Sequence, residues 1–374
     1  MPWARVPAVL RDPREDACRG ASHRASIRPS RRVIATDQVN VSDSIEIRPY
    51  RPGDETALVA GYNKVFPTED GKIKPRSMEH WHWKFRDNPT GLIHVAVAEH
   101  EQEGIVGCYV TLPVKIRTEG TYGICGQVVD LFVLPEFRRH TGRPGLFVHT
   151  ALKQYEWFGG NEEGQNLFHY GWPVPNWRIG HKYLNYENVC NWDFLFRECA
   201  GTPREATEDL EVIQVERFGE EVDALWAAME PSFELALVRD ARYLNWRYAD
   251  AHDHDYRLYE CRERSTGKVR GLFVYSVCDF LFPRTGFVVD WLLPHDDADA
   301  TVAMLAVAER QASADGAKIL ATLFGHMDPR FLQFQRLGYM LYGTSYFVVV
   351  APFKYSTHYY REHWYITAGD SDLV

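Results

Sequence analysis

The run Gln127–Leu146 constrains the fold most, because it joins an apolar β segment to a basic turn that contains glycine. Residues 128–134 are mostly β-branched, aromatic or aliphatic, which is typical of a strand. Pro135 has no N–H for a sheet ladder, so we predict that the strand ends just before it. Apolar side chains then recur at helical spacing over residues 146–158, and Pro144 suits the first turn of that helix.

The turn between this strand and helix has the composition of an anion site. A helix N-terminus presents free backbone N–H groups and the positive end of the helix dipole to one point. Arg138, Arg139 and Arg143 add charge that could pair with phosphate oxygens. The sequence therefore predicts that an anion such as a pyrophosphate binds here, although this segment taken alone is also compatible with a solvated loop.

Composition narrows the class of protein. The chain has 374 residues, enough for two domains, with 45% apolar and 25% charged residues, as in ordinary soluble proteins. Its net charge of -9 argues against a nucleic-acid binder, and no apolar run is long enough to span a membrane. The seven cysteines are scattered without a CxxC pair, so we expect reduced thiols in a cytoplasmic protein. We expect no metal, and we interpret the one candidate cluster, His252–Asp255, as a solvated loop.

The basic turn resembles the acyl-CoA pyrophosphate loop of the GCN5-related N-acetyltransferase (GNAT) superfamily. That loop reads Gln or Arg, two residues, Gly, one residue, then Gly or Ala. Here Arg139, Gly142 and Pro144 fill the pattern, and Gly145 stands one place late. The resemblance implies acetyl-CoA or another acyl-CoA as cosubstrate. The cofactor-binding residues that it implies on the strand and loop are Leu131, Phe132, Val133, Arg138, Arg139, Thr141, Gly142, Arg143 and Gly145.

A second motif lies after the next predicted strand, Leu167–Pro173. Asn176 is followed seven residues later by Tyr183, so both would lie on one face of a helix. In GNAT enzymes this pair holds CoA and protonates the departing thiolate, so the resemblance implies those roles for Asn176 and Tyr183. Tyr186 is a reserve candidate, and Tyr183 could instead be an ordinary helix residue.

The start of the chain gives the boundaries of the first domain. Residues 1–43 carry eight arginines in the first 32 positions, and we expect a disordered tail outside the fold. From residue 44, a strand, a Pro-Gly-Asp turn and a helix over Glu55–Phe66 resemble the opening of a GNAT domain. The aromatic run Trp81–Phe85 is expected to pack onto the core rather than to bind a ligand. The next strands are predicted at His94–Glu99, Ile105–Leu112 and Val114–Arg117.

The second half of the chain repeats the first at an offset near 160 residues. Trp83–Asp87 corresponds to Trp246–Asp250, and Val128–Asp130 corresponds to Val288–Asp290. We therefore predict two domains, an acyl-CoA-binding domain at 44–200 and a degenerate copy at 209–374. The second copy has the acidic run His295–Asp299 in place of the basic loop, and Phe334 in place of the tyrosine. It should not bind CoA, and we expect it to wall the acceptor site.

The resulting prediction is a mixed α/β protein of two GNAT-like domains, each a twisted mixed sheet flanked by helices. The resemblance implies an acyl-CoA-dependent N-acyltransferase that moves an acetyl or short acyl group to a primary amine of a small molecule, such as a nucleotide-linked amino sugar. Asp130 is the candidate base, although its repeat Asp290 favours a structural role. A homodimer is left open. The alternatives are a non-catalytic CoA- or anion-binding protein and an aminoacyl-tRNA-dependent peptidoglycan transferase.

Overall fold

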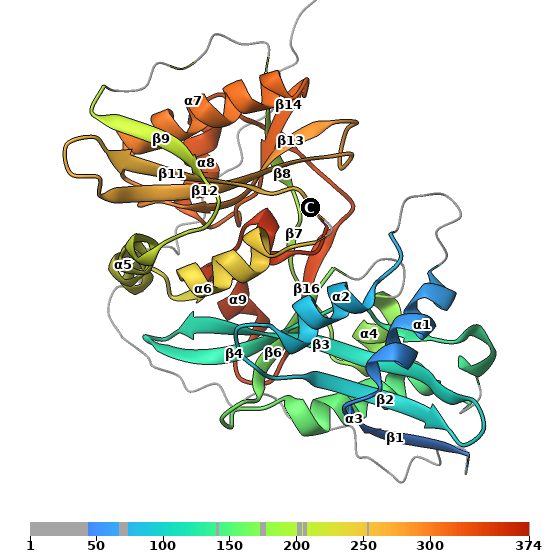
Figure 1. The fold of residues 1–374 in the computed structure, drawn as a ribbon. Helices are drawn as coiled ribbons and strands as arrows, with labels where there is room; N and C mark the ends of the chain where they lie inside the picture. Colours follow the sequence, from blue (N-terminus) through green and yellow to red (C-terminus); the bar gives the residue numbers. More distant parts are fainter. Residues whose placement is uncertain are drawn as a thin grey trace, which may run out of the picture. The chain divides into compact units, whose positions relative to one another are not determined.

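The computed structural model describes residues 44–66, 74–139, 142–172, 177–199, 204, 208–252 and 254–373, which belong to one compact unit. They form two mixed β-sheets flanked by helices (Figure 1), which confirms the predicted mixed α/β class. The predicted tail, residues 1–43, lies outside the described residues. No helix in the described ranges is both long and apolar enough to cross a bilayer.

The first sheet is built mainly from the first half of the chain. Its order is β1 (Ile45–Pro49), β2 (His94–His100), β3 (Gly104–Thr118), β4 (Thr121–Val128), β6 (Asn166–Gly171), β16 (Phe347–Pro352) and β7 (Glu187–Asn191). The short strands β5 (Phe132–Val133) and β10 (Leu235–Leu237) pair with β3, and β17 (Trp364–Tyr365) pairs with β10. Neighbours from β1 to β4 are antiparallel, whereas β4 and β6 are parallel.

Helices cover both faces of the first sheet. Helices α1 (Glu55–Val65) and α2 (Met78–Trp81) lie on one face and α3 (Leu146–Phe158) on the other (Figure 1). Helix α1 contacts β3 and β5, whereas α3 contacts β2 and β3. The shorter elements are a π-helical turn η1 (His82–Arg86) after α2, a 3-10 turn η2 (Pro135–Phe137) after β5, and α4 (Trp177–Tyr183) after β6.

The second sheet has the order β9 (Leu210–Val215), β11 (Arg257–Glu263), β12 (Val269–Cys278), β13 (Thr285–Leu292), β14 (Ile319–Thr322), β8 (Phe194–Glu198) and β15 (Met340–Tyr342). Its helices are α5 (Glu220–Met229), α6 (Ala241–Leu244), α7 (Ala298–Ala314) and α8 (Pro329–Arg336), with the turns η3 (Glu230–Ser232), η4 (Asn245–Ala249) and η5 (Ala368–Asp370). Helix α9 (Thr357–His363) contacts β7 and β17 of the first sheet. Helix α7 packs along β9, β12, β13 and β14.

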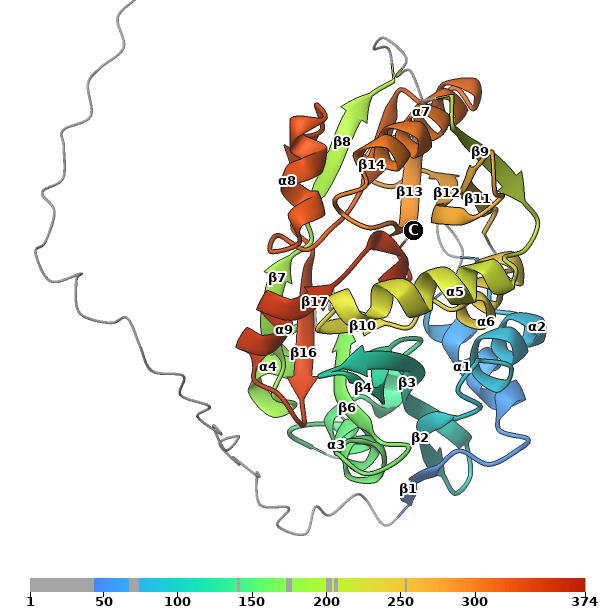
Figure 2. The ribbon, with the colours of Figure 1, turned by 90° about the vertical axis from the view of Figure 1, so that its left-hand side faces the viewer.

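The two sheets share one order of elements, and each takes a strand from the other half of the chain. In the first sheet β6 is followed by β16 and β7, and in the second β14 is followed by β8 and β15. Figure 2 shows β16 beside β6 and β7, and β8 beside β14. The predicted division into residues 44–200 and 209–374 is therefore crossed in both directions: β10, β16 and β17 of the second half join the first sheet, and β8 of the first half joins the second.

The repeated tryptophan motifs contact each other directly. Trp83 in η1 and Trp246 in η4 each donate the indole N–H to the other's backbone carbonyl, at 2.7 and 2.8 Å. Their rings stack with centroids 5.7 Å apart. Both residues lie in π-helical turns that follow a short α-helix, so the sequence repeat corresponds to a repeat of local structure.

Three local features differ from the sequence expectations. The strand predicted over 128–134 is interrupted, because β4 ends at Val128 and β5 begins at Phe132. The two strands predicted on either side of Pro113 form one strand, β3. On one side of β3, pairing with β2 ends at Thr111 and pairing with β10 begins at Ile116, so no described strand pairs with Pro113 on that side. A residue without an N–H is tolerated at such a position. Helix α3 begins after its N-cap Gly145, so Pro144 precedes the helix instead of lying in its first turn.

Candidate functional site

Helix α3 begins at a glycine and has an open N-terminus. Its N-cap, Gly145, has φ +96 and no side chain to accept from the first N–H groups, and no acidic residue lies in the first turn. A Cβ at this position would lie 3.0 Å from the carbonyl oxygen of Arg138. Gly142 has φ +72 and donates its N–H to the carbonyl of Arg139 at 3.1 Å. The loop path therefore depends on both glycines, and no side chain of the described residues caps the N-terminus of α3.

Positive charge surrounds this open end. Arg138, Arg139 and Arg143 are exposed, and within the described residues none of them forms an ion pair with a carboxylate. The Arg138 Nε donates to the carbonyl of Val133 at 3.3 Å, which ties this side chain to the end of β5. Thr141, the remaining predicted loop residue, lies outside the described residues.

The strand that leads to the loop carries a β-bulge. Tyr109 and Val110 of β3 face the three residues 129–131, so one extra residue is inserted between β4 and β5. Asp130 has φ +49 at this point. Pairing of β4 with β6 ends at Gln127 and Tyr170, and among the described strands β5 pairs with β3 alone. The edge of residues 131–133 that would face β6 is therefore open to a ligand.

The Asp130 side chain is 11% exposed and is held by two cations. It accepts from Lys84 Nζ at 3.0 Å and from Arg76 Nη2 at 3.2 Å. Burial alone would raise the pKa of Asp130, but the charges of Lys84 and Arg76 outweigh it and lower the pKa to about 2. An ionised group of such low pKa accepts a proton weakly, which argues against the predicted role of Asp130 as general base.

Tyr183 is the last residue of α4 and is half-buried. It packs in a cluster with Tyr109, Phe147 and Leu131, on the α3 side of the sheet. Lys182 Nζ lies 4.9 Å from the centre of the Tyr183 ring. Asn176, its predicted companion, lies outside the described residues.

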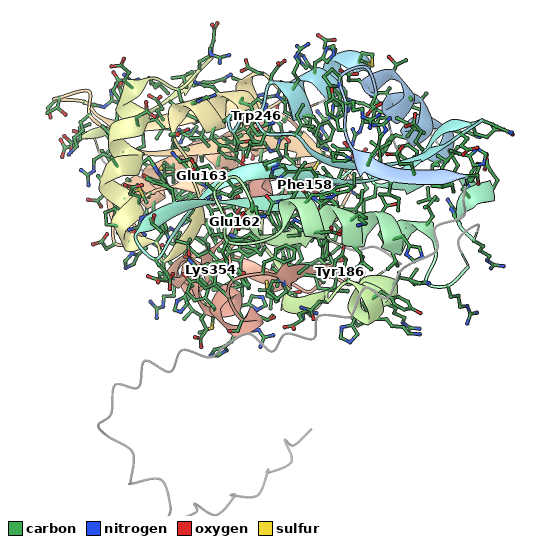
Figure 3. All side chains as sticks on the ribbon, turned by 90° about the horizontal axis from the view of Figure 1, so that it is seen from below. Phe158, Glu162, Glu163, Tyr186, Trp246 and Lys354 are labelled. Atoms are coloured by element: carbon green, nitrogen blue, oxygen red, sulfur yellow. The ribbon has the colours of Figure 1, made fainter. Side chains whose placement is uncertain are left out.

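Unlike Tyr183, Tyr186 forms a hydrogen bond within the core. Its hydroxyl bonds to that of Tyr109 at 2.5 Å, and its ring packs against Gly180, where a Cβ would lie 2.1 Å from it. Burial raises the pKa of Tyr186 to about 12. Figure 3 shows Tyr186 beside α4, with Phe158 at the far end of α3. Tyr186 therefore anchors α4 to the sheet.

The groups around Asp130 were not predicted from the sequence. The polar residues that line a small cavity of about 30 Å³ beside it are Tyr62, Arg76 and His80. Lys84 is buried although it is a lysine, and it stands within the aromatic run Trp81–Phe85. A lysine inside such a run is a signal that could have pointed to a buried ion pair.

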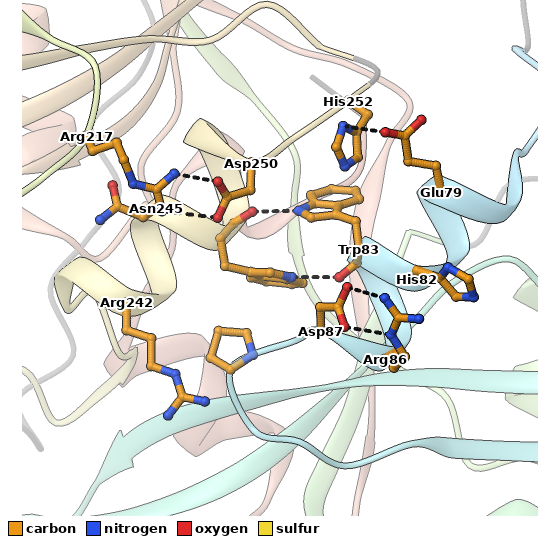
Figure 4. Close-up of a pocket in the computed structure, with 12 residues that line it drawn as sticks. Glu79, His82, Trp83, Arg86, Asp87, Arg217, Arg242, Asn245, Asp250 and His252 are labelled. Carbon is orange, nitrogen blue, oxygen red and sulfur yellow. Dashed lines mark hydrogen bonds and ion pairs between the residues drawn. The ribbon is translucent and has the colours of Figure 1, made fainter. Parts of the chain in front are cut away.

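A larger groove of about 710 Å³ lies between the two tryptophan motifs (Figure 4). Its walls carry two ion pairs, Arg86 with Asp87 at 2.8 Å and Arg217 with Asp250 at 2.5 Å. Residues from both halves of the chain line this groove. However, no residue that lines this groove also lines the cavity beside Asp130. The groove and the Asp130 cavity are thus separate.

In the second half, a side chain of the corresponding loop caps the N-terminus of the following helix, α7. Asp297 is the N-cap of α7 and accepts from the Ala300 N–H at 3.1 Å, and Arg270 donates to the same carboxylate at 2.6 Å. Phe334, which stands where the tyrosine was expected, is fully buried. No group of three or more potential metal ligands lies together within the described residues, and Asp253 of the cluster His252–Asp255 is outside them.

Several solved structures resemble this fold. A protein from Enterococcus faecalis, described as a probable N-acyltransferase, matches with a TM-score of 0.59 and 10% identity over 84% of this chain and 74% of its own. A GCN5-related N-acetyltransferase from Anabaena variabilis matches with a TM-score of 0.57 and 13% identity, over 82% of this chain and 72% of its own. Saccharomyces cerevisiae N-myristoyltransferase with bound myristoyl-CoA matches with a TM-score of 0.52 and 12% identity, over 84% of each chain.

Comparisons with protein-family models and with curated proteins find no match. The structural likeness covers most of the described chain. Because the sequence identities are only 10–13%, this likeness establishes the fold alone. The chain therefore has the fold shared by GCN5-related N-acetyltransferases and N-myristoyltransferase.

Proposed function

We propose that this chain is an acyl-CoA-dependent N-acyltransferase that moves an acetyl or short acyl group to a primary amine of a small molecule. The fold is shared with acyltransferases, one of which was solved with bound myristoyl-CoA. The observation that carries the proposal is the uncapped N-terminus of α3, with its unpaired arginines beside the open edge of β5. This arrangement suits the pyrophosphate of CoA, with the pantetheine arm along residues 131–133.

The transfer requires a neutral amine to bond to the thioester carbonyl carbon while the C–S bond breaks and the thiolate takes up a proton. Backbone N–H groups at the bulge would stabilise the charge that develops on the carbonyl oxygen. Tyr183 would supply the proton to the thiolate. Asp130, held ionised by Lys84 and Arg76, would orient the amine, whose own proton would leave to water.

We further propose that the second half is a copy of the first that has lost the CoA site, so that the protein is a tandem GNAT enzyme. A cytoplasmic enzyme agrees with the free thiols of the six described cysteines. An amino sugar linked to a nucleotide remains our preferred acceptor class.

The experiment is calorimetric titration of the purified protein with acetyl-CoA and with free CoA, using wild type and Gly142→Glu. The new carboxylate should weaken binding by about 100-fold or more, because two like charges about 4 Å apart repel by about 4 kcal/mol at an effective dielectric constant near 20. Gly267→Glu is the matched control, since Gly267 also has φ +72 and open space around its Cβ position. Equal affinity in the two variants would remove the loop assignment. Binding without turnover of any amine would favour the non-catalytic alternative.

A further inference from the structure

We infer that Trp246 of the second half is a positioning residue for the Asp130 site of the first half. Trp246 and Trp83 bond to each other, and this tryptophan clamp fixes the helical turn from which Lys84 reaches Asp130. The role rests on the proposed function, in which Asp130 orients the acceptor amine. Through the clamp, the second half controls a site that it does not itself contain.

The clamp exists because both tryptophans lie in π-helical turns. In an α-helix the Asp87 N–H would bond to the carbonyl of Trp83, four residues before it. In η1 it bonds instead to the carbonyl of His82 at 2.9 Å, so the Trp83 carbonyl is left for a donor from outside the helix. That donor is the indole N–H of Trp246, at 2.8 Å.

The second half repeats this arrangement, so the two turns hold each other. In η4 the Asp250 N–H bonds to the carbonyl of Asn245 at 2.9 Å, which leaves the Trp246 carbonyl for the indole of Trp83 at 2.7 Å. Figure 4 shows the two bonds of the clamp as dashed lines at Trp83. Both bonds are buried, and a buried carbonyl is costly to leave without a donor. Each indole therefore stabilises the π-helical form of the opposite turn.

The turn that Trp246 holds also carries a cation of the Asp130 site. Lys84 is the residue after Trp83, and its Nζ lies 3.0 Å from the Asp130 carboxylate. The second cation, Arg76, lies just before α2. Both cations are thus attached to α2 and η1, and the position of these elements sets the charge around Asp130. Because a lysine side chain is long and flexible, a fixed backbone limits where its ammonium group can reach.

The clamp and the Asp130 site involve different faces of this helical segment. The groove between the tryptophan motifs is lined by Glu79, His82, Trp83 and Arg86, and the cavity beside Asp130 by His80, Trp81 and Phe85. Such alternation is the spacing of two faces of one helix. A displacement on the groove face would therefore also move the face that carries the Asp130 contacts.

The second half does not use its own turn in this way. Arg247, which follows Trp246, donates to the carbonyl of Ser371 at 2.9 Å. The cation on the repeated carboxylate, Asp290, is Arg239 instead. Among the described contacts, the clamp thus reaches an aspartate site in the first half only.

The test is Trp246→Phe, which keeps an aromatic ring and removes the indole N–H. The Lys84 ammonium group should move away from Asp130, so the pKa of Asp130 should rise from about 2 toward its ordinary 3.8. The carboxyl carbon NMR signal of Asp130, titrated through the acid range, measures this rise. The kcat should fall by about tenfold or more while the affinity for acetyl-CoA is unchanged, because positioning is lost and CoA binding is not.

Trp192→Phe is the matched control. Trp192 is 1% exposed, and its indole N–H has no partner within the described part of the chain, so the same atoms are removed without loss of a bond. The Asp130 titration and kcat of this variant should be those of wild type. Trp83→Phe removes the other bond of the clamp and should raise the pKa of Asp130 in the same direction as Trp246→Phe.

An Asp130 titration identical to wild type in folded Trp246→Phe would overturn the inference, and so would an equal rise in Trp192→Phe. If Trp246→Phe does not fold, Trp83→Phe decides in its place. If neither folds, hydrogen exchange of the two indole N–H groups in wild type decides, and fast exchange would overturn the clamp. The proposed function is tested separately, because failure of wild type to bind acetyl-CoA would remove that function while the Asp130 titration still reports on the clamp.

Discussion

Helices α3 and α7 occupy the same place in the two sheets, yet their N-termini differ. Helix α3 begins at Gly145 without a side-chain cap, whereas Asp297 caps α7 and is held by Arg270. A carboxylate at a helix N-terminus satisfies the same N–H groups and the same dipole that a phosphate would. The second half is therefore complete without a ligand, and the first half is not.

The two repeated aspartates show the same contrast. Asp290 is 1% exposed and is bonded by Arg239 at 2.9 Å and by Tyr248 at 2.8 Å. Asp130 has Lys84 and Arg76 as partners and borders a cavity. An ion-paired carboxylate at this position thus serves the fold in both halves, but only in the first half can it also meet a ligand.

The largest expected effect is the loss of stability when the cation that holds each of these aspartates is replaced. Arg239→Met should lower the free energy of unfolding by about 3–5 kcal/mol, because it leaves the buried carboxylates of Asp290 and Asp370 without their cation. Lys84→Met should also be destabilising but less so, because Arg76 still pairs with Asp130. Arg239→Met should cost more, since Arg239 also bonds Asp370 at 2.8 Å. Denaturant unfolding measures both. The exposed pair of Lys153 with Glu156 is the control, and Lys153→Met should be nearly neutral.

The ion pairing of Asp130 also makes the stability of the protein depend on pH in the acid range. Its pKa is lowered from 3.8 to about 2, so the stabilisation is complete above pH 3.8 and is lost as the pH falls toward 2. In Lys84→Met the pKa of Asp130 should rise, and the loss should begin at higher pH. Thermal unfolding recorded against pH measures this shift, and identical profiles for wild type and variant would contradict the ion pair.

A smaller effect compares the tyrosine of the first half with the buried Phe334 of the second. Tyr183→Phe should lower kcat by about 100-fold, within the range for loss of a general acid, without change in affinity for acetyl-CoA. Thiol release in the presence of a panel of primary amines measures kcat. Tyr186→Phe is the control, because the Tyr186 hydroxyl is bonded within the core. A greater loss of kcat in Tyr186→Phe would transfer the acid role to Tyr186.

The sequence predicted what depends on local pattern. Helix α3 has the predicted bounds because apolar side chains recur at helical spacing over residues 146–158. The bulge at Asp130 has no such signature, since it depends on how β3 and β4 pair. The Asp130 contacts with Lys84 and Arg76 span 46 and 54 residues of sequence, and the exchange of β8 and β16 spans still more. Such contacts follow from the folded chain and not from neighbouring residues.

The most direct test of the central claim is the stoichiometry of free CoA binding to the full chain, measured by calorimetry. One CoA should bind per chain, at the open end of α3 and not at the capped end of α7. Two CoA molecules per chain would contradict the difference between the halves. The absence of binding would contradict the CoA site itself.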